Sequence, residues 1–206
     1  SGQSVREQGS CPILWSIPVS DPTQTTPGLN AIDQALERIT HDVGLVVDRI
    51  IDLDPHEAMV VQERPAGQDQ VHLSFRLNLD WNGQVGQGCL LMPLEHANGL
   101  AASLMMLAEP QVDELRKLES PDRATKDAMI ELGSFIGGAI HDQLADSLTE
   151  TVLVAPAGCQ GVRAGVRPAL EYTDGTDLWV TQANCNIENW TASDWILMLP
   201  DLTAAV

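Results

Sequence analysis

The feature that most restricts the fold of this chain is a pair of apolar stretches joined by a very short turn. Residues 71–79 alternate apolar and polar side chains, as expected of a strand that buries one face. Asn82-Gly83 follows, the strongest short-range signal for a two-residue hairpin, and 85–93 returns as a second strand. The inward-facing side chains of the first strand are predicted to be Val71, Leu73, Phe75, Leu77 and Leu79. Strands joined by so short a turn must be antiparallel.

Helical and strand signals then alternate in runs along the rest of the chain. Apolar residues recur every three to four positions in the helices, and four more strand candidates close the sequence. Helices are predicted over 29–51, from Pro93 until Glu109-Pro110, over 112–119, and from Ser120-Pro121 to about Ser147. Strands are predicted over 58–63, 151–156, 161–172, 177–187 and 194–200. We therefore expect an α/β chain of the α+β kind, with a largely antiparallel sheet and long helices on one face.

The order of the elements also suggests two repeated halves. An ungapped alignment of the chain with itself that pairs Asp33 with Asp127 also pairs predicted helix with helix and strand with strand over about thirty residues. In addition, "LLMP" before the second helix resembles "LMLP" in the last strand. The residue pairs that coincide are Asp33/Asp127, Glu37/Glu131, Gly44/Gly138 and Asp52/Asp146. Residues 1–28 stand apart as an N-terminal extension rich in Pro, Ser and Thr, which we expect to pack on an edge of the domain formed by 29–206.

The composition excludes several classes of partner. A net charge of −18 repels phosphate backbones and anionic lipid, so we expect neither nucleic acid nor a membrane surface as a partner. No apolar run is long enough to cross a bilayer and the start of the sequence has no signal-peptide pattern, which favours a cytoplasmic location. Cys11, Cys89, Cys159 and Cys185 form no CxxC pair and no metal-ligand spacing, so we expect buried, reduced thiols.

The long predicted helix carries an unusual polar stripe. Its core side is predicted to consist of Met129, Ile130, Leu132, Phe135, Ile136 and Ile140. The opposite stripe reads Asp127, Glu131, Ser134, Gly138 and His141. Three glycines, at 133, 137 and 138, lie inside this helix, and each destabilises a helix by up to about 1 kcal/mol relative to alanine. The glycines either let a neighbouring element approach closely or leave room for a macromolecular partner.

The same residues resemble a known signature. Asp127-x3-Glu131-x2-Ser134, followed after twenty-one residues by Pro156, is similar to that of the CheC/CheX/FliY chemotaxis phosphatases. That signature has Asp or Ser, three residues, Glu, two residues, Asn, twenty-one residues and Pro, so the sequence departs from it only in having Ser134 for Asn. The flanking stretches "ELGSFIGGAI", "GCLLMPLEHANGLAASLM" and "WILMLP" are also similar, and the resemblance covers about 29–200.

The resemblance implies a CheC-like fold and a reaction on another protein. Members of this family remove the phosphoryl group from the aspartate of a CheY-like response regulator, whose own Mg²⁺ serves the reaction, so no cofactor of this chain is expected. By the family pattern, Glu131 pairs with a lysine of the regulator and residue 134 orients the attacking water. Asp127, Glu131 and Gly138 would form the partner-binding face, and Glu131 and Ser134 the catalytic pair. CheX-type members form homodimers.

Ser134 leaves three interpretations open. The chain is an active phosphatase, a catalytically weak or inactive CheC-like domain that binds a response regulator or another signalling or flagellar partner, or a regulatory or assembly domain with no response-regulator partner. The flagellar-switch protein FliM resembles a precedent for this fold without the phosphatase residues. A weaker echo of the motif, Asp33-x3-Glu37-x2-Thr40, has Gln62 where the proline would stand, and we interpret it as a solvated helix face. Arg163 and Arg167 would share one side of a strand, either as an anion contact or as solvated edge residues.

Overall fold

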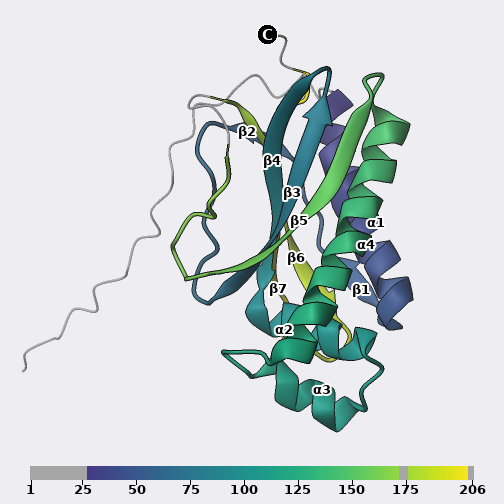
Figure 1. The fold of residues 1–206 in the computed structure, drawn as a ribbon, viewed down its shortest axis with the longest axis vertical. Helices are drawn as coiled ribbons and strands as arrows, with labels where there is room; N and C mark the ends of the chain where they lie inside the picture. The colour runs from purple at the N-terminus through teal and green to yellow at the C-terminus, as the bar shows by residue number, and fades with distance from the viewer. Residues whose placement is uncertain (1–26, 172–175, 204–206) are drawn as a thin grey trace, which may run out of the picture.

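The computed structural model describes residues 27–171 and 176–203, which form one antiparallel sheet with helices on one face (Figure 1). The helices are α1 (Pro27–Val47), α2 (Leu94–Leu104), α3 (Glu109–Arg116) and α4 (Arg123–Ser147). The strands are β1 (Ile51–Leu53), β2 (Met59–Val61), β3 (His72–Trp81), β4 (Gln84–Pro93), β5 (Val152–Val162), β6 (Leu178–Ile187) and β7 (Ser193–Pro200). The expected fold class is confirmed, with α1 and α4 side by side over the sheet (Figure 1).

The strand order shows how the two halves are combined. The sheet runs β1-β6-β7-β4-β3-β5, and β2 also pairs with β6. The first half supplies a helix, edge strands and the β3–β4 hairpin, and the second half supplies α4, the edge strand β5 and the β6–β7 hairpin. Each half therefore pairs its edge strand with the hairpin of the other half, and the hairpins meet where β4 pairs with β7. This arrangement confirms the predicted pseudo-repeat.

The sheet buries its helix-facing side and part of the other side. On the helix side, Phe75, Leu77 and Leu79 alternate along β3 and join the main core beneath α1 and α4. On the other side, a smaller cluster lies against the segments that follow β2 and β5. Arg64 Nη1 donates to the carbonyl of Pro168 at 2.7 Å, and Gly165 N donates to the carbonyl of Gly67 at 2.8 Å, so these two segments hold each other in place.

Several predicted boundaries are wrong for identifiable reasons. The first helix ends at Val47 because Asp48 adopts φ 54° and Arg49 N closes back on the Gly44 carbonyl at 2.9 Å, so Ile51 begins a strand. Glu109-Pro110 does not end the second helix but begins α3, where a proline in the first turn loses no hydrogen bond.

The start of the long helix and one predicted strand also differ from expectation. Asp122, and not Ser120, caps α4: its Oδ1 accepts from Thr125 N at 2.8 Å, and this bond lowers the pKa of the carboxyl. The predicted strand over 161–172 is wrong beyond Val162, so Arg163 and Arg167 share no strand face. Tyr172 and the turn Asp174-Gly175 lie outside the described residues.

Two apolar side chains predicted to face inward are exposed, Val71 at 42% and Ile130 at 54%. Cys89 and Cys185 are buried in strands and Cys159 is half-buried, and all three are free thiols, while Cys11 lies outside the described residues. Burial raises the pKa of the Cys89 thiol to about 12, which leaves it protonated and unreactive. Within 27–171 and 176–203, no helix has the length and apolar character needed to span a membrane.

Candidate functional site

Helix α4 presents the predicted motif on its exposed face. Asp127, Glu131, Ser134 and Gly138 are all exposed, because the helix turns its other side to the sheet and to α1. The buried side of α4 consists of Thr125, Ala128, Met129, Leu132, Gly133, Ile136, Gly137, Ala139, Ile140 and Leu144. The 3.6-residue period of the helix thus places the four motif residues along one line roughly 16 Å long, from position 127 to 138.

The polar groups on this face have few intramolecular contacts. Among the described residues, the Glu131 carboxylate has no hydrogen-bond or ion-pair partner. Asp127 Oδ2 lies 3.8 Å from Arg123 Nε, an exposed pair that stabilises the helix by only a few tenths of a kcal/mol. Ser134 Oγ donates a long bond of 3.4 Å to the Ile130 carbonyl one turn earlier. These side chains therefore remain available to another molecule.

The three glycines of α4 have different surroundings. A Cβ added at Gly133 would lie 3.4 Å from Phe75 Cδ1, and one at Gly137 would lie 3.5 Å from the Pro156 ring and 3.6 Å from Leu77. Both glycines therefore line the contact between α4 and the sheet. A Cβ at Gly138 would meet nothing within 4 Å. Internal packing thus gives no reason for a glycine at 138, which lies one turn beyond Ser134.

Pro156 lies beside this face although it comes from the sheet. It is exposed on the edge strand β5, at an irregularity where the register with β3 shifts between Phe75 and Leu77. Proline is tolerated there because an edge strand or a bulge does not need its missing N–H. Its ring lies 3.5 Å from the Cβ position of Gly137, so the structure brings the distant motif proline next to the helix.

The exposed polar face of α4 that begins at Asp127 does not extend as far as His141. Beyond Gly138, α4 is joined to α1 by ion pairs from Arg38 to Asp142 at 3.3 Å and to Asp146 at 3.5 Å. Gln143 Nε2 also donates to Gln34 Oε1 at 2.9 Å. His141 is half-buried, and its Nδ1 has no hydrogen-bond partner among the described residues. The available face therefore covers the first two thirds of the helix.

The equivalent positions of the first half do not form a second site. Asp33 Oδ2 accepts from Ala58 N at 3.0 Å, so this carboxylate supports the segment before β2. Thr40 is 5% exposed, and its hydroxyl donates to the Glu37 carbonyl at 2.8 Å. A Cβ at Gly44 would lie 2.7 Å from the Arg49 carbonyl oxygen. Of these α1 positions, only Glu37 is freely exposed. The residues of α1 that repeat the motif spacing therefore support the fold and do not form an exposed face like that of α4.

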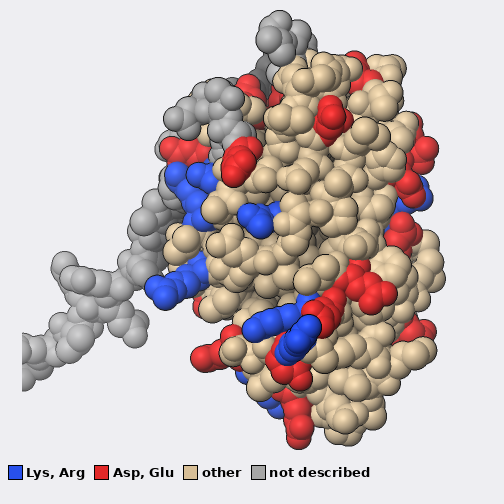
Figure 2. Space-filling view, viewed as in Figure 1, with Lys and Arg blue, Asp and Glu red and all other residues tan. Residues whose placement is uncertain are grey.

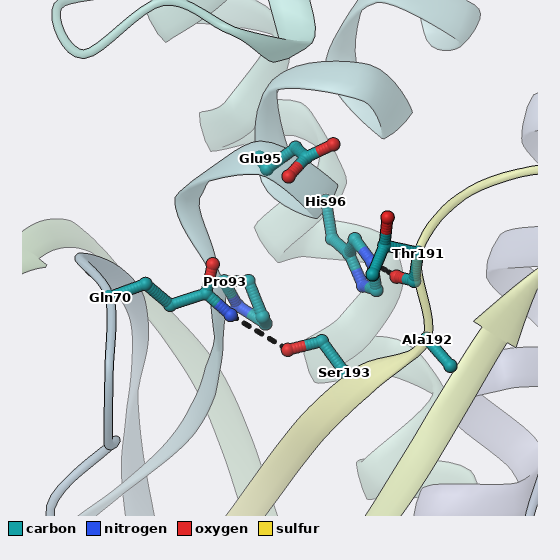
Figure 3. Close-up of a pocket in the computed structure, with 7 residues that line it drawn as sticks. All are labelled: Gln70, Pro93, Glu95, His96, Thr191, Ala192 and Ser193. Atoms are coloured by element: carbon teal, nitrogen blue, oxygen red, sulfur yellow. Dashed lines mark hydrogen bonds between the residues drawn. The ribbon is translucent and has the colours of Figure 1, made fainter.

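A small pocket lies elsewhere, near the start of α2, and it contains none of the motif residues (Figure 3). It measures about 70 Å³ and is lined by Gln70, Pro93, Glu95, His96, Thr191, Ala192 and Ser193. Trp195 Nε1 donates to His96 Nδ1 at 3.0 Å, so His96 Nε2 carries the proton that is donated to the Thr191 carbonyl at 2.8 Å. Burial lowers the pKa of His96, which favours this neutral form.

The histidine of this pocket is therefore fully bonded and serves the fold. No cluster of three or more potential metal ligands occurs within 27–171 and 176–203. Sequence reasoning did not identify this pocket, whose lining comes from three separate segments. Neither this pocket nor a second one, beside Val85 on the hairpin, is lined by the motif residues of α4, whose exposed helix face suits contact with a macromolecule better than capture of a small molecule.

Comparison with known proteins gives matches at the level of structure. No family model matches the sequence, and no curated protein is significantly similar to it. FliY from Thermotoga maritima superposes with a TM-score of 0.62 at 13% identity, covering 89% of this chain and 93% of that one. The chemotaxis protein CheX from Desulfovibrio desulfuricans superposes with a TM-score of 0.56 at 10% identity, covering 84% of this chain and 100% of that one.

A CheC-like superfamily protein from Shewanella superposes with a TM-score of 0.53 at 12% identity, covering 82% of this chain and 97% of that one. These identities are low, whereas the coverage of both chains is nearly complete, so the shared property is the arrangement of helices and strands. The chain therefore has the fold of the FliY, CheX and CheC-like proteins.

Proposed function

We propose that α4 docks on the phosphorylated receiver domain of a CheY-like response regulator and promotes hydrolysis of its phospho-aspartate. The observation that carries the proposal is the exposed line of Asp127, Glu131, Ser134 and Gly138 on α4, beside Pro156. Asp127, Glu131 and Pro156 match the CheC/CheX/FliY signature and Ser134 replaces its Asn, on a chain with the fold of those proteins. The role is thus one in chemotaxis or in related two-component signalling.

In this reaction a water attacks the phosphorus while the bond from phosphorus to the aspartate oxygen breaks. The aspartate leaves as a carboxylate and the products are inorganic phosphate and the free regulator. Ser134 holds the attacking water through its hydroxyl, and the Glu131 carboxylate pairs with a lysine of the regulator. The regulator's Mg²⁺ neutralises charge on the phosphoryl oxygens. The contribution of this chain is therefore positioning, without a covalent intermediate on its own residues.

Serine has a shorter arm than the asparagine of the family signature, and the open space at Gly138 offsets part of this difference. A water bound to Ser134 lies closer to the helix axis, so the partner must approach α4 more closely. Gly138, one turn further along the same face, has no Cβ to hinder that approach and nothing within 4 Å of the position where one would lie. A displacement on the order of 1 Å would still cost about 10²-fold in rate.

The decisive experiment measures the decay of phosphorylated receiver domains of the source organism in Mg²⁺, with and without this protein. Acceleration by the wild type, lost in Glu131→Gln and Ser134→Ala, is the expected result. Glu37→Gln is the matched control, because Glu37 is the exposed acid at the equivalent position of α1. If no receiver domain loses its phosphate faster in the presence of the wild type, the chain is not a phosphatase.

One observation favours a second candidate, a domain that binds the phosphorylated regulator without hydrolysing it. Ser134 Oγ donates to the carbonyl of its own helix at 3.4 Å, a bond that competes with holding a water. Binding to a receiver domain activated with beryllofluoride, without any faster loss of phosphate, would identify this function. Ser134→Asn should raise the hydrolysis rate under either candidate, because it restores the longer amide arm. Unchanged or lower activity would mean that position 134 is used differently.

A further inference from the structure

The first two turns of α4 expose residues that neither the fold nor the phosphatase signature explains. Ile130 is 54% exposed, although the helical period of the sequence places it with the core. The Lys126 side chain is exposed and forms no hydrogen bond or ion pair within 27–171 and 176–203, although its charge helps to lower the pKa of the Asp122 carboxyl. The Arg123 side chain is 94% exposed and pairs with Asp127 at 3.8 Å. Figure 2 shows basic and acidic side chains gathered side by side over the lower part of the molecule, where α4 begins.

These residues lie on the same line as Ser134. Positions 126, 130 and 134 are spaced by four, so their side chains follow one another along the surface of the helix. At about 1.5 Å per residue, Ile130 lies about 6 Å from Ser134 along the axis and Lys126 about 12 Å. A standard interface covers about 800 Å² on each partner, which corresponds to a disc of roughly 16 Å radius. A protein centred on Ser134 therefore covers both Ile130 and Lys126.

We propose that Arg123, Lys126 and Ile130 form a second contact region, which selects receiver domains that carry a carboxylate next to an apolar side chain beside their phosphorylation site. The inference rests on the proposed function, because it assigns the partner of the same helix face. Charge complementarity identifies the occupant. In a chain of net charge −18, two exposed cations lie at the start of the docking helix, beside the exposed Asp122 and Asp127. The cations offset the general repulsion between this chain and an acidic partner surface.

The two kinds of residue contribute differently. The cations lie at the rim, so their effect is mainly on the association rate and is reduced by salt. Ile130 lies nearer the centre and loses its remaining exposed apolar surface when a partner covers it, which stabilises the complex against dissociation. Substitutions at these positions should therefore raise KM for the phosphorylated regulator and leave kcat unchanged. Glu131 and Ser134 differ, because their substitutions also lower kcat.

The test measures the binding of beryllofluoride-activated receiver domains of the source organism at low and high salt. Lys126→Glu should weaken binding roughly tenfold at low salt and less at high salt, and Ile130→Gln should weaken it roughly tenfold at both. The matched controls are Arg163→Glu, which reverses an exposed charge just beyond β5, and Val85→Gln, which removes an apolar side chain that is 80% exposed on the hairpin. Thermal melting of every variant verifies folding.

The possible outcomes separate this inference from the proposed function. If the wild type binds, Glu131→Gln weakens binding, and Lys126→Glu and Ile130→Gln bind like the controls, the second contact region is disproved and the proposed function stands. If the wild type binds no receiver domain, both fail together. If all four surface variants lose affinity equally, the effect is non-specific and the region has no role in selection. Selective loss in Lys126→Glu and Ile130→Gln, with the predicted difference in salt dependence, establishes it.

Discussion

Replacing Gly138 with alanine tests whether this glycine serves close packing within the protein or leaves room for a binding partner. A Cβ at this position would meet nothing within 4 Å, so the substitution introduces no clash. Alanine is the better helix former by about 1 kcal/mol in the interior of a helix. We therefore expect Gly138→Ala to raise the free energy of unfolding by up to about 1 kcal/mol and the melting temperature by about 2–4 °C.

The same methyl group projects from the face that is proposed to contact the receiver domain. We expect it to hold the partner away from Ser134 and to slow hydrolysis by about 10²-fold, the cost of a displacement on the order of 1 Å. Urea unfolding and phosphate-release assays on one protein preparation measure both effects. A variant that is more stable than the wild type and equally active would refute the idea that position 138 lacks a side chain in order to admit the receiver domain.

Gly44→Ala provides the control for the stability argument. Its Cβ would lie 2.7 Å from the Arg49 carbonyl oxygen, a backbone atom that cannot move aside easily. The clash should outweigh the gain in helix propensity, so this variant should unfold at a lower urea concentration than the wild type. If Gly44→Ala and Gly138→Ala shift the midpoint in the same direction, the surroundings of the two glycines do not decide their effect.

Three further predictions concern stability and assembly. Burial lowers the pKa of His72 and of His96, so the folded protein holds both side chains neutral, whereas the unfolded chain binds their protons below about pH 6.5. The free energy of unfolding, measured in urea, should therefore fall as the pH drops below that value. A free energy of unfolding that stays constant down to pH 5 would contradict this prediction. Gly99→Ala places a Cβ 2.3 Å from Trp190, on which Arg116 stacks at 4.4 Å, so thermal melting should show a loss of at least about 2 kcal/mol. The family resemblance implies a homodimer, for which light scattering should give twice 22.3 kDa, and the mass of one chain would exclude it.

The parts of the fold that could be predicted from the sequence are those encoded by local patterns. The β3–β4 hairpin follows from Asn82-Gly83, whose φ values of 49° and 78° are those the short turn requires. The exposed line on α4 follows from the helical period, because position along a helix fixes the face. The contact between Pro156 and the helix could not be predicted in this way, because it depends on how β5 packs against α4.

The parts that failed depend on neighbours that a sequence pattern does not show. Periodicity placed Ile130 in the core, but 54% of the residue is exposed to solvent. Thr40 and Ser134 occupy equivalent places in the two halves, yet the threonine is buried and the serine is exposed. The cap of α4 was misplaced by two residues, because Asp122 and Ser120 are both good capping residues and only the backbone geometry chooses between them.

The exchange of edge strands between the two halves has a consequence for how the chain acquires its shape during synthesis. The β3–β4 hairpin has no neighbour on either side until residues 152–200 have emerged, because β5 and β7 are both supplied by the later half. Closing such distant pairs is entropically slow, so folding must await nearly the whole chain. Helix α4 is synthesised after β3 but before β5, the edge strand on which it mainly packs, and a truncated product lacking β5 would have no Pro156 beside the helix. The proposed docking surface is thus complete only in a chain that includes β5.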